Sequence, residues 1–457
     1  MTTPAPAPRN EPAASAANPP VPRNEPATDT PVPSTSIAST AGSSAPAAGA
    51  HPQPAPADSA PPQPSWRTLA LVAGITGALT LLLFAFCTTR VGLQKDDAGQ
   101  YYQMAESPAF LARLPYTFRV FSPGLAGLWP GDPVTGFTLV TLLALPLAAT
   151  ALYAYQRSIN LGHGAALAGA LLFTVSGGAI RMLTTPVYVD AVTYLTEAAA
   201  FWLLARRQFW PFVAVVSVGV LNRETALLLI APYLLVAPPW KPPTAWTRAL
   251  LLVAIPSAVF ALVVILKLAA GDVLAGTTPL ATLAPFARTF RQDIPSLPEL
   301  FDVYSTLGVL WLLALRHLPG PTSVQRRALV YGALVILQLT VSRGDEGRNL
   351  SHLFPLVIPL AMLEVQRLLR PSAASRPAER VLSADGAHAD VARAAPGRQG
   401  IALAVLLVAA CAASMVHARW TMLEPATLRY GLVAVGTVLA LAIVWGRPLL
   451  LRMVPRR

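Results

Sequence analysis

The sequence has few of the residues that support metal or redox chemistry. It contains 2 cysteines and 6 histidines among 457 residues. Cys87 and Cys411 lie within or at the end of apolar segments, without the spacing of a zinc site or a disulfide framework. His163 and His352 each lack a second histidine at metal-ligand spacing. These shortages argue against a disulfide scaffold, a redox enzyme and a zinc site.

Charged residues are also scarce, and this decides the class of protein. Only 12% of the residues are charged, 54% are hydrophobic, and the mean hydropathy is +0.52. That composition excludes a soluble domain of this length and predicts an all-α polytopic membrane protein. The net charge of +12 comes from short basic clusters at the ends of apolar segments, as topology signals do. Because no basic folded domain is present, nucleic-acid binding is excluded.

The composition changes along the chain and divides it into four parts. The first part is rich in Pro, Ala and Ser and cannot bury enough apolar surface to fold, so it is predicted to be a disordered tail. The predicted parts are the tail at 1–65, a transmembrane module at 66–370 with a polar outer loop at 90–133, a cytoplasmic linker at 371–399, and a C-terminal transmembrane pair with a basic tail at 400–457.

Segments of about 20 apolar residues are long enough to cross a bilayer. The predicted segments are 66–88, 134–155, 164–183, 187–205, 209–236, 250–270, 300–315, 328–342, 350–363, 401–417 and 430–445. The segment 209–236 is too long for one span and is interrupted by Asn222, Arg223 and Glu224, so we predict a hairpin of two short helices. The arginine-rich loops then share one side, which predicts a bundle of about 10–12 transmembrane helices with both termini in the cytoplasm.

Acidic residues and arginines gather in the loops predicted at the outer face. Asp96 and Asp97 open a stretch that predicts a short helix along the membrane surface, with Tyr101 one turn after Asp97. Further along the chain come Arg119, Asp190, Arg343, Asp345, Glu346 and Arg348. Ionised groups near hydrocarbon are costly, so their gathering on one face indicates a polar substrate there. An acid can take a proton from an acceptor hydroxyl while arginines hold a lipid phosphate.

Three motifs resemble bacterial integral-membrane glycosyltransferases of the GT-C type. They are Asp97-Ala-Gly-Gln-Tyr101-Tyr102-Gln-Met-Ala105 followed by Pro115-Tyr-Thr-Phe-Arg119-Val-Phe-Ser-Pro123, then Asn222-Arg223-Glu224-Thr225 inside the apolar hairpin, and Arg348 ahead of Leu353-Phe-Pro355. The resemblance covers residues 66–370. It implies that an acidic residue of the first outer loop is the catalytic base or orients the acceptor, and that the sugar donor is a polyprenyl phosphate. Carried over, Asp97 is the first choice for the base and Asp96 the second.

The resemblance implies a function at the outer face of a bacterial inner membrane. A sugar would move from a polyprenyl-phosphate donor to a hydroxyl of a glycan or lipid. Such proteins commonly carry a large outer domain after the last span, and its lack here favours a small or lipid-linked acceptor. The expected substrate-binding residues are Tyr101, Tyr102, Arg119, Asp190, Arg223, Glu224, Arg343, Asp345, Glu346 and Arg348, with Arg119 and Arg348 on the phosphate and Arg223 with Glu224 shaping the cavity. No cofactor is required, and the role of a divalent ion stays open because Asp96 and Asp97 alone offer a weak oxygen site.

Simpler interpretations of these residues stay open. Asp96 or Asp97 can cap the surface helix, and Arg119 can be an interfacial arginine with its head in water. Asp345, Glu346 and Arg348 can form a solvated turn. The alternative function is a transporter or flippase of lipid-linked glycans or another polar solute, which also needs buried charges. The sequence shows no internal repeat in corresponding halves and no paired broken helices, which argues against it.

Overall fold

The computed structural model describes residues 63–86, 96–107, 116–236, 244–269, 304–318, 322–339 and 350–369, with short pieces inside 405–412 and 431–442. Every regular element in these ranges is a helix, which confirms the predicted all-α class. The predicted tail up to residue 62 and the predicted linker at 371–399 lie outside the described residues.

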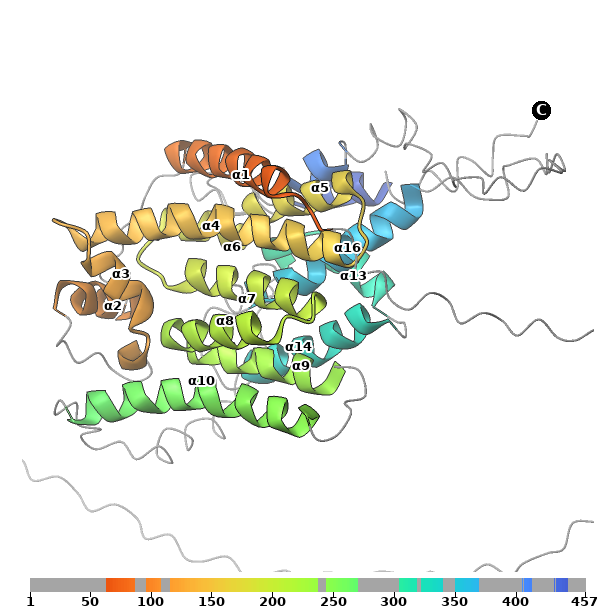
Figure 1. The fold of residues 1–457 in the computed structure, drawn as a ribbon. Helices are drawn as coiled ribbons and strands as arrows, with labels where there is room; N and C mark the ends of the chain where they lie inside the picture. The colour runs from red at the N-terminus through yellow and green to blue at the C-terminus, as the bar shows by residue number, and fades with distance from the viewer. Residues whose placement is uncertain are drawn as a thin grey trace, which may run out of the picture. The chain divides into compact units, whose positions relative to one another are not determined.

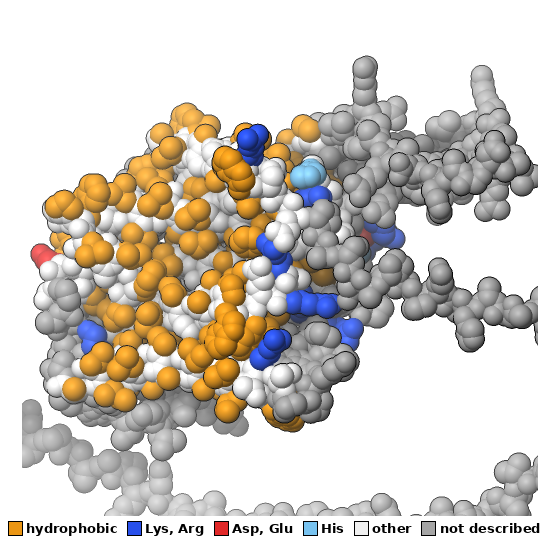
Figure 2. Space-filling view, in the orientation of Figure 1, with side chains coloured by type: hydrophobic (Ala, Val, Ile, Leu, Met, Phe, Trp, Pro, Cys, Tyr) orange, Lys and Arg blue, Asp and Glu red, His pale blue; other side chains and the backbone are white. Residues whose placement is uncertain are grey.

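Two of the long apolar helices of the described residues, the first and the last of those named next, lie on the outside of the bundle. Within the described ranges, α1 (Trp66–Phe86), α4 (Pro133–Ser158) and most of α10 (Thr244–Ala269) are long and apolar enough to cross a membrane. Leu71 of α1 is 63% exposed and Leu250 of α10 is 68% exposed. Apolar side chains cover much of the face shown in Figure 2. A surface of this kind is stable only against lipid, so the chain is an integral membrane protein.

The outer loop at 90–133 holds three short helices at one end of α4 (Figure 1). These are α2 (Asp96–Glu106), η1 (Tyr116–Phe118) and α3 (Phe121–Gly127). The short helix predicted after Asp96 corresponds to α2. The carboxylate of Asp132 accepts a hydrogen bond from the backbone N–H of Val134 at 3.1 Å, and this cap starts α4 directly after the loop.

The segment predicted as one span at 164–183 is divided in two. Helix α5 (His163–Thr174) and helix α6 (Gly177–Thr184) are bent by 41°. The break lies at Ser176, whose backbone is extended and whose hydroxyl accepts from the N–H of Ala179 at 3.3 Å, as an N-cap does. The described residues thus contain a second broken helix that the apolar pattern did not predict.

The segment at 209–236 folds as α8 (Phe209–Asn222), η2 (Glu224–Leu229) and α9 (Ile230–Val236). Arg223 between α8 and η2 has extended backbone angles, φ −159° and ψ 127°. The Tyr233 ring of α9 lies 5.2 Å from the Phe212 ring near the start of α8. The chain therefore turns back at Arg223, as the hairpin prediction requires.

The centre of the bundle is built on α7 (Asp190–Ala205), which packs along α4 (Figure 1). Helices α13 (Leu310–His317), α14 (Ser323–Leu339) and α16 (Phe354–Leu369) complete the described core. The ring of Phe201 in α7 lies 5.7 Å from that of Tyr155 in α4 and 5.3 Å from that of Tyr331 in α14. All three rings are buried, so they fix the three helices against one another.

Glycine sets the distance between the outer loop and α4. A Cβ added at Gly136 would overlap the backbone carbonyl of Ala126 in α3. We expect Gly136→Ala to destabilise the protein by about 1–3 kcal/mol, because backbone atoms cannot move aside as a side chain can. Gly74→Ala is the control, since nothing lies within 4 Å of a Cβ added there. Equal midpoints of thermal unfolding for the two variants in detergent would contradict this close packing.

Candidate functional site

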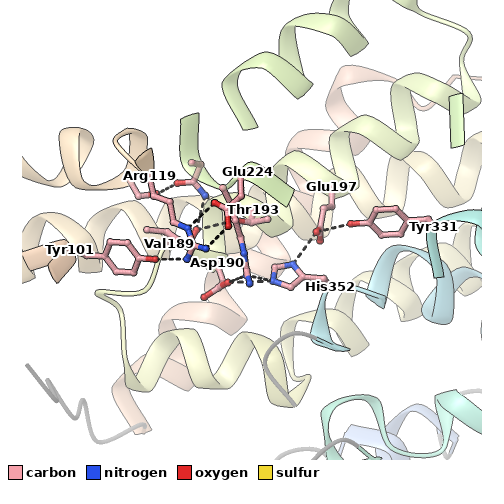
Figure 3. A network of polar contacts seen from close by, with 12 residues as sticks. Tyr101, Arg119, Val189, Asp190, Thr193, Glu197, Glu224, Tyr331 and His352 are labelled. Carbon is pink, nitrogen blue, oxygen red and sulfur yellow. Dashed lines mark hydrogen bonds and ion pairs between the residues drawn. The ribbon is translucent and has the colours of Figure 1, made fainter. Parts of the chain in front are cut away.

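Two groups of polar side chains meet at the break in the hairpin (Figure 3). We call Asp97, Tyr101, Tyr116, Arg119 and Glu224 the outer cluster, and Asp190, Glu197, Arg223, Tyr331 and His352 the inner cluster. Neighbouring side chains of an extended chain point to opposite sides, so Arg223 and Glu224 face different partners although they are adjacent.

The outer cluster is centred on Arg119, which is only 6% exposed. Its Nε and Nη2 donate to the two carboxylate oxygens of Glu224 at 3.0 and 2.6 Å. Its Nη1 donates to the hydroxyl of Tyr101 at 2.7 Å. A bidentate guanidinium–carboxylate pair is among the strongest polar contacts in proteins and fixes both planes. The residue directly after η1 is therefore tied to the first residue of η2, 105 positions later.

Asp97 is held at the edge of this cluster by Tyr116. The phenol of Tyr116 donates to Asp97 Oδ1 at 2.5 Å. The Tyr116 ring meets Tyr101 edge-on at 5.6 Å, and the guanidinium of Arg119 lies 5.4 Å from its centroid. Burial and the hydrogen bond to Asp97 raise the pKa of Tyr116, so the phenol stays a donor. Asp97 is half-buried and joins a buried, ordered network.

Arg119 keeps its positive charge in this cluster. Burial alone would lower the pKa of Arg119, but contacts with Tyr101 and Glu224 outweigh it and raise the pKa. The guanidinium is thus ionised and directed into the protein. It does not extend to an interface in the manner of a snorkelling side chain.

The inner cluster lies deeper, between α7, α14 and the residues before α16. Arg223 Nη1 donates to Asp190, and His352 Nε2 lies 3.3 Å from the same Asp190 oxygen. His352 Nδ1 lies 2.9 Å from Glu197 Oε1, close enough for an ion pair although not aligned as a hydrogen bond. The hydroxyl of Tyr331 donates to Glu197 at 2.8 Å. All of these side chains are at least nine-tenths buried.

Charge balance constrains the inner cluster. Asp190 and Glu197 carry two negative charges, and Arg223 supplies one positive charge. Unpaired charges in a dry interior cost several kcal/mol each, so a proton held between His352 and the two carboxylates would neutralise the described group. The imidazole lies between the two acids, with Nδ1 beside Glu197 and with Nε2 in contact with both Asp190 and Nη1 of Arg223.

Asn222 ties both clusters to the rest of the bundle. Its side-chain amide donates to the backbone carbonyl of Val189 and to the hydroxyl of Thr193, both at 2.9 Å. Its amide oxygen accepts from the hydroxyl of Ser122 in α3. Three consecutive polar residues in an apolar run therefore end α8 and reach three different elements.

The structure brings together many of the predicted site residues. Asp97, Tyr101, Arg119 and Glu224 lie in the outer cluster, and Asp190 and Arg223 in the inner cluster. Tyr102 of α2 lies near Glu106 and Asp132 instead, and within the described part of the chain it joins neither cluster. The side chain of Asp96 and the residues Arg343, Asp345, Glu346 and Arg348 lie outside what the structure describes.

Tyr116, Glu197, Tyr331 and His352 were not among the predicted site residues. Glu197 follows Asp190 by seven residues, which places both on the same side of a helix, and Glu197 is only 3% exposed. That spacing of two helical turns was the available signal. His352 gave no local signal, because its partner Asp190 is 162 residues away. Among the described residues, no three His, Cys, Asp or Glu side chains are arranged to hold a metal ion.

Comparisons with known proteins add little about chemistry. No protein-family model matches the chain, and no curated protein matches it. Among solved structures, the chain is similar to ArnT from Cupriavidus metallidurans, crystallised in the apo state, with a TM-score of 0.43 and 16% identity. The similarity covers 84% of this chain and 79% of that chain. The chemistry has to come from the residues of the chain itself.

The Arg119–Glu224 pair offers a direct test of the outer cluster. We expect Glu224→Gln to lower the free energy of unfolding by about 3 kcal/mol, because it leaves the buried guanidinium without a carboxylate. The double variant Arg119→Gln/Glu224→Gln should be less damaged than the sum of the single variants. Glu106→Gln, in an exposed acid of α2, is the matched control and should stay within about 0.5 kcal/mol. Additive losses in detergent unfolding would show that the pair is not coupled.

The inner cluster predicts that the effect of Glu197→Gln on stability changes sign when His352 is replaced. His352→Phe should destabilise the protein, because two buried carboxylates then share one guanidinium. Glu197→Gln should destabilise the wild-type chain but restore part of the stability of His352→Phe, since it removes the excess negative charge. Unfolding midpoints of the four proteins in detergent measure this. If Glu197→Gln is harmful in both backgrounds, the charge-balance account is wrong.

Proposed function

We propose that the chain is a membrane glycosyltransferase of the GT-C type. It transfers a sugar from a polyprenyl-phosphate donor to a hydroxyl of a glycan or lipid at the periplasmic face of a bacterial inner membrane. The observation that carries the proposal is the placement of Asp97, a half-buried carboxylate of the first outer loop. It is held by Tyr116, whose ring in turn lies against the guanidinium of Arg119, the partner of Glu224. The motifs around Asp97 and Asn222-Arg223-Glu224 that resemble this class are the segments that meet there.

Asp97 has the geometry that a general base requires. A catalytic carboxylate must keep one orientation, and the donor phenol of Tyr116 and the rings packed around it supply that orientation. In the proposed reaction, Asp97 takes the proton from the acceptor hydroxyl while the hydroxyl oxygen attacks the anomeric carbon. The bond from that carbon to the phosphate oxygen breaks, and the polyprenyl phosphate leaves with the electron pair.

The departing phosphate needs positive charge. Arg119 is paired with Glu224 through two hydrogen bonds, so in this scheme it positions the site. Arg348 stays the proposed phosphate ligand, with Arg343 beside it in the sequence. Tyr101, Tyr102 and Asp190 stay proposed contacts of the substrates. The scheme needs no cofactor, and a divalent ion stays open.

A transporter or flippase is the second candidate, and one observation favours it. The described residues contain two broken helices, at Ser176 and at Arg223, and a buried charge cluster beside the second break. Broken helices and buried ionisable groups are typical of transport pathways. The two candidates differ in the bond that changes, because only a glycosyltransferase splits the donor.

Loss of the Asp97 carboxylate tests the proposed reaction. Polyprenyl-phosphate hexoses and pentoses labelled in the sugar are offered to purified protein with a membrane lipid extract as acceptor, and released polyprenyl phosphate is measured. We expect Asp97→Asn to lower turnover by about 10²–10⁴-fold, the usual contribution of a general base. Asp132→Asn, at the exposed cap of α4, is the control and should keep most of the turnover.

Two results would contradict the proposal. Full turnover in Asp97→Asn, and also in Asp96→Asn/Asp97→Asn, would remove the acidic base. Uptake of an intact labelled donor into vesicles, dependent on an ion gradient and without release of polyprenyl phosphate, would establish transport instead.

A further inference from the structure

The end of the bundle away from α2 and α3 holds a buried arginine that forms no ion pair with an acid among the described residues. Arg327, in the first turns of α14, is only 8% exposed, and its Nε is buried without a hydrogen-bond acceptor among the described residues. The buried acid at this end, Glu364, is already engaged by Arg316 at 3.0 Å and by Arg367 at 2.7 Å. A guanidinium removed from water needs an anion or strong acceptors, and the Nε of Arg327 has none among the described residues.

Two further polar groups lie near Arg327. The groups that act electrostatically on its guanidinium are the phenol of Tyr155 in α4 and the guanidinium of Arg207 after α7. The hydroxyl of Tyr155 is also buried without a partner among the described residues. The Tyr155–Phe201–Tyr331 ring stack holds α4, α7 and α14 together immediately beside this position. Two positive charges and a hydroxyl donor therefore converge where three helices end or begin.

Arg207 occupies a backbone position that favours glycine. Its φ is +56°, in the left-handed region. Its own N–H bonds the carbonyl of Leu204 at 3.1 Å and that of Gln208 bonds Leu203 at 3.0 Å, closing the end of α7. Arg207 itself is exposed, and an arginine in a strained position at a helix end, near the buried Arg327, is better explained by a need for its charge than by the turn itself.

We propose that Arg327, Arg207 and Tyr155 form a binding site for a phosphate group, at the end of the bundle where most of the Lys and Arg side chains on the face of Figure 2 gather. Lysine and arginine mark the cytoplasmic side of membrane proteins, and basic pockets between helices on that side bind anionic headgroups. The phosphate of an anionic phospholipid and a free phosphate share this chemistry. The site is separate from the outer cluster and does not rest on the proposed transfer reaction.

The experiment uses the full chain purified in a neutral detergent. Its thermal midpoint is measured with added phosphatidylglycerol, with phosphatidylcholine, and with inorganic phosphate. We expect phosphatidylglycerol to raise the midpoint by several degrees and phosphatidylcholine to leave it nearly unchanged. Arg327→Gln and Arg207→Gly should each lose most of the rise, and Tyr155→Phe should lose part of it. Arg207→Gly removes the charge and keeps the backbone turn.

Arg326→Gln is the matched control, because Arg326 is the exposed neighbour and its loss changes the net charge equally. It should keep the rise. Without lipid, Arg327→Gln should be at least as stable as the wild type, since it removes a buried unpaired charge. An equal rise with inorganic phosphate supports the site and assigns it to a soluble phosphate. The proposal is overturned if Arg327→Gln keeps the full rise, if Arg326→Gln loses it equally, or if Arg327→Gln is destabilised without lipid, which would reveal a protein acceptor.

Discussion

The break at Asn222-Arg223-Glu224 is the constraint on which the outer end of the bundle depends. Extended backbone inside an apolar bundle must satisfy its own polar groups. The N–H of Arg223 bonds the carbonyl of Gly219 at 2.8 Å, and its carbonyl accepts from Ala226 at 3.0 Å, so both are satisfied locally. The side chains of these three residues then contact α3, α7 and Arg119, the residue directly after η1. Because one short stretch of chain holds all three, the outer and inner clusters are fixed relative to each other.

Arg223 and Glu224 are adjacent in the chain, and this makes the arrangement of the two clusters rigid. Glu224 forms an ion pair with Arg119, while Arg223 forms one with Asp190. A rotation that improved one pair would pull the other apart, because the two side chains leave the same extended backbone on opposite sides. Reciprocal pairing of this kind orders a site before any substrate arrives, and that order is the main requirement of general-base chemistry by positioned side chains.

The amino-acid sequence predicts which residues have to be paired but not with whom. Apolar length predicted the positions of α1, α4 and α10, and the cost of burying ions singled out Arg119, Arg223 and Glu224. The partnerships are long-range, since Arg119 and Glu224 are 105 residues apart, and no local pattern encodes them. The sequence did not predict the bend between α5 and α6, for another reason. Ser176 and the glycines after it weaken a helix only slightly, and packing decides whether it breaks.

The two ends of the described bundle differ in the sign of their excess charge. This difference affects how a lipid phosphate would be held. In the outer cluster, Glu224 is paired with Arg119 and Asp97 is held by the neutral phenol of Tyr116, so the described side chains of the cluster carry an excess negative charge when both acids are ionised. A phosphate brought there would be repelled by that excess. Positive charge must then come from outside the cluster, which is the role proposed above for Arg348. In the proposed reaction the labour is therefore divided, with Asp97 serving the acceptor and Arg348 serving the donor, while Arg119 stays paired with Glu224.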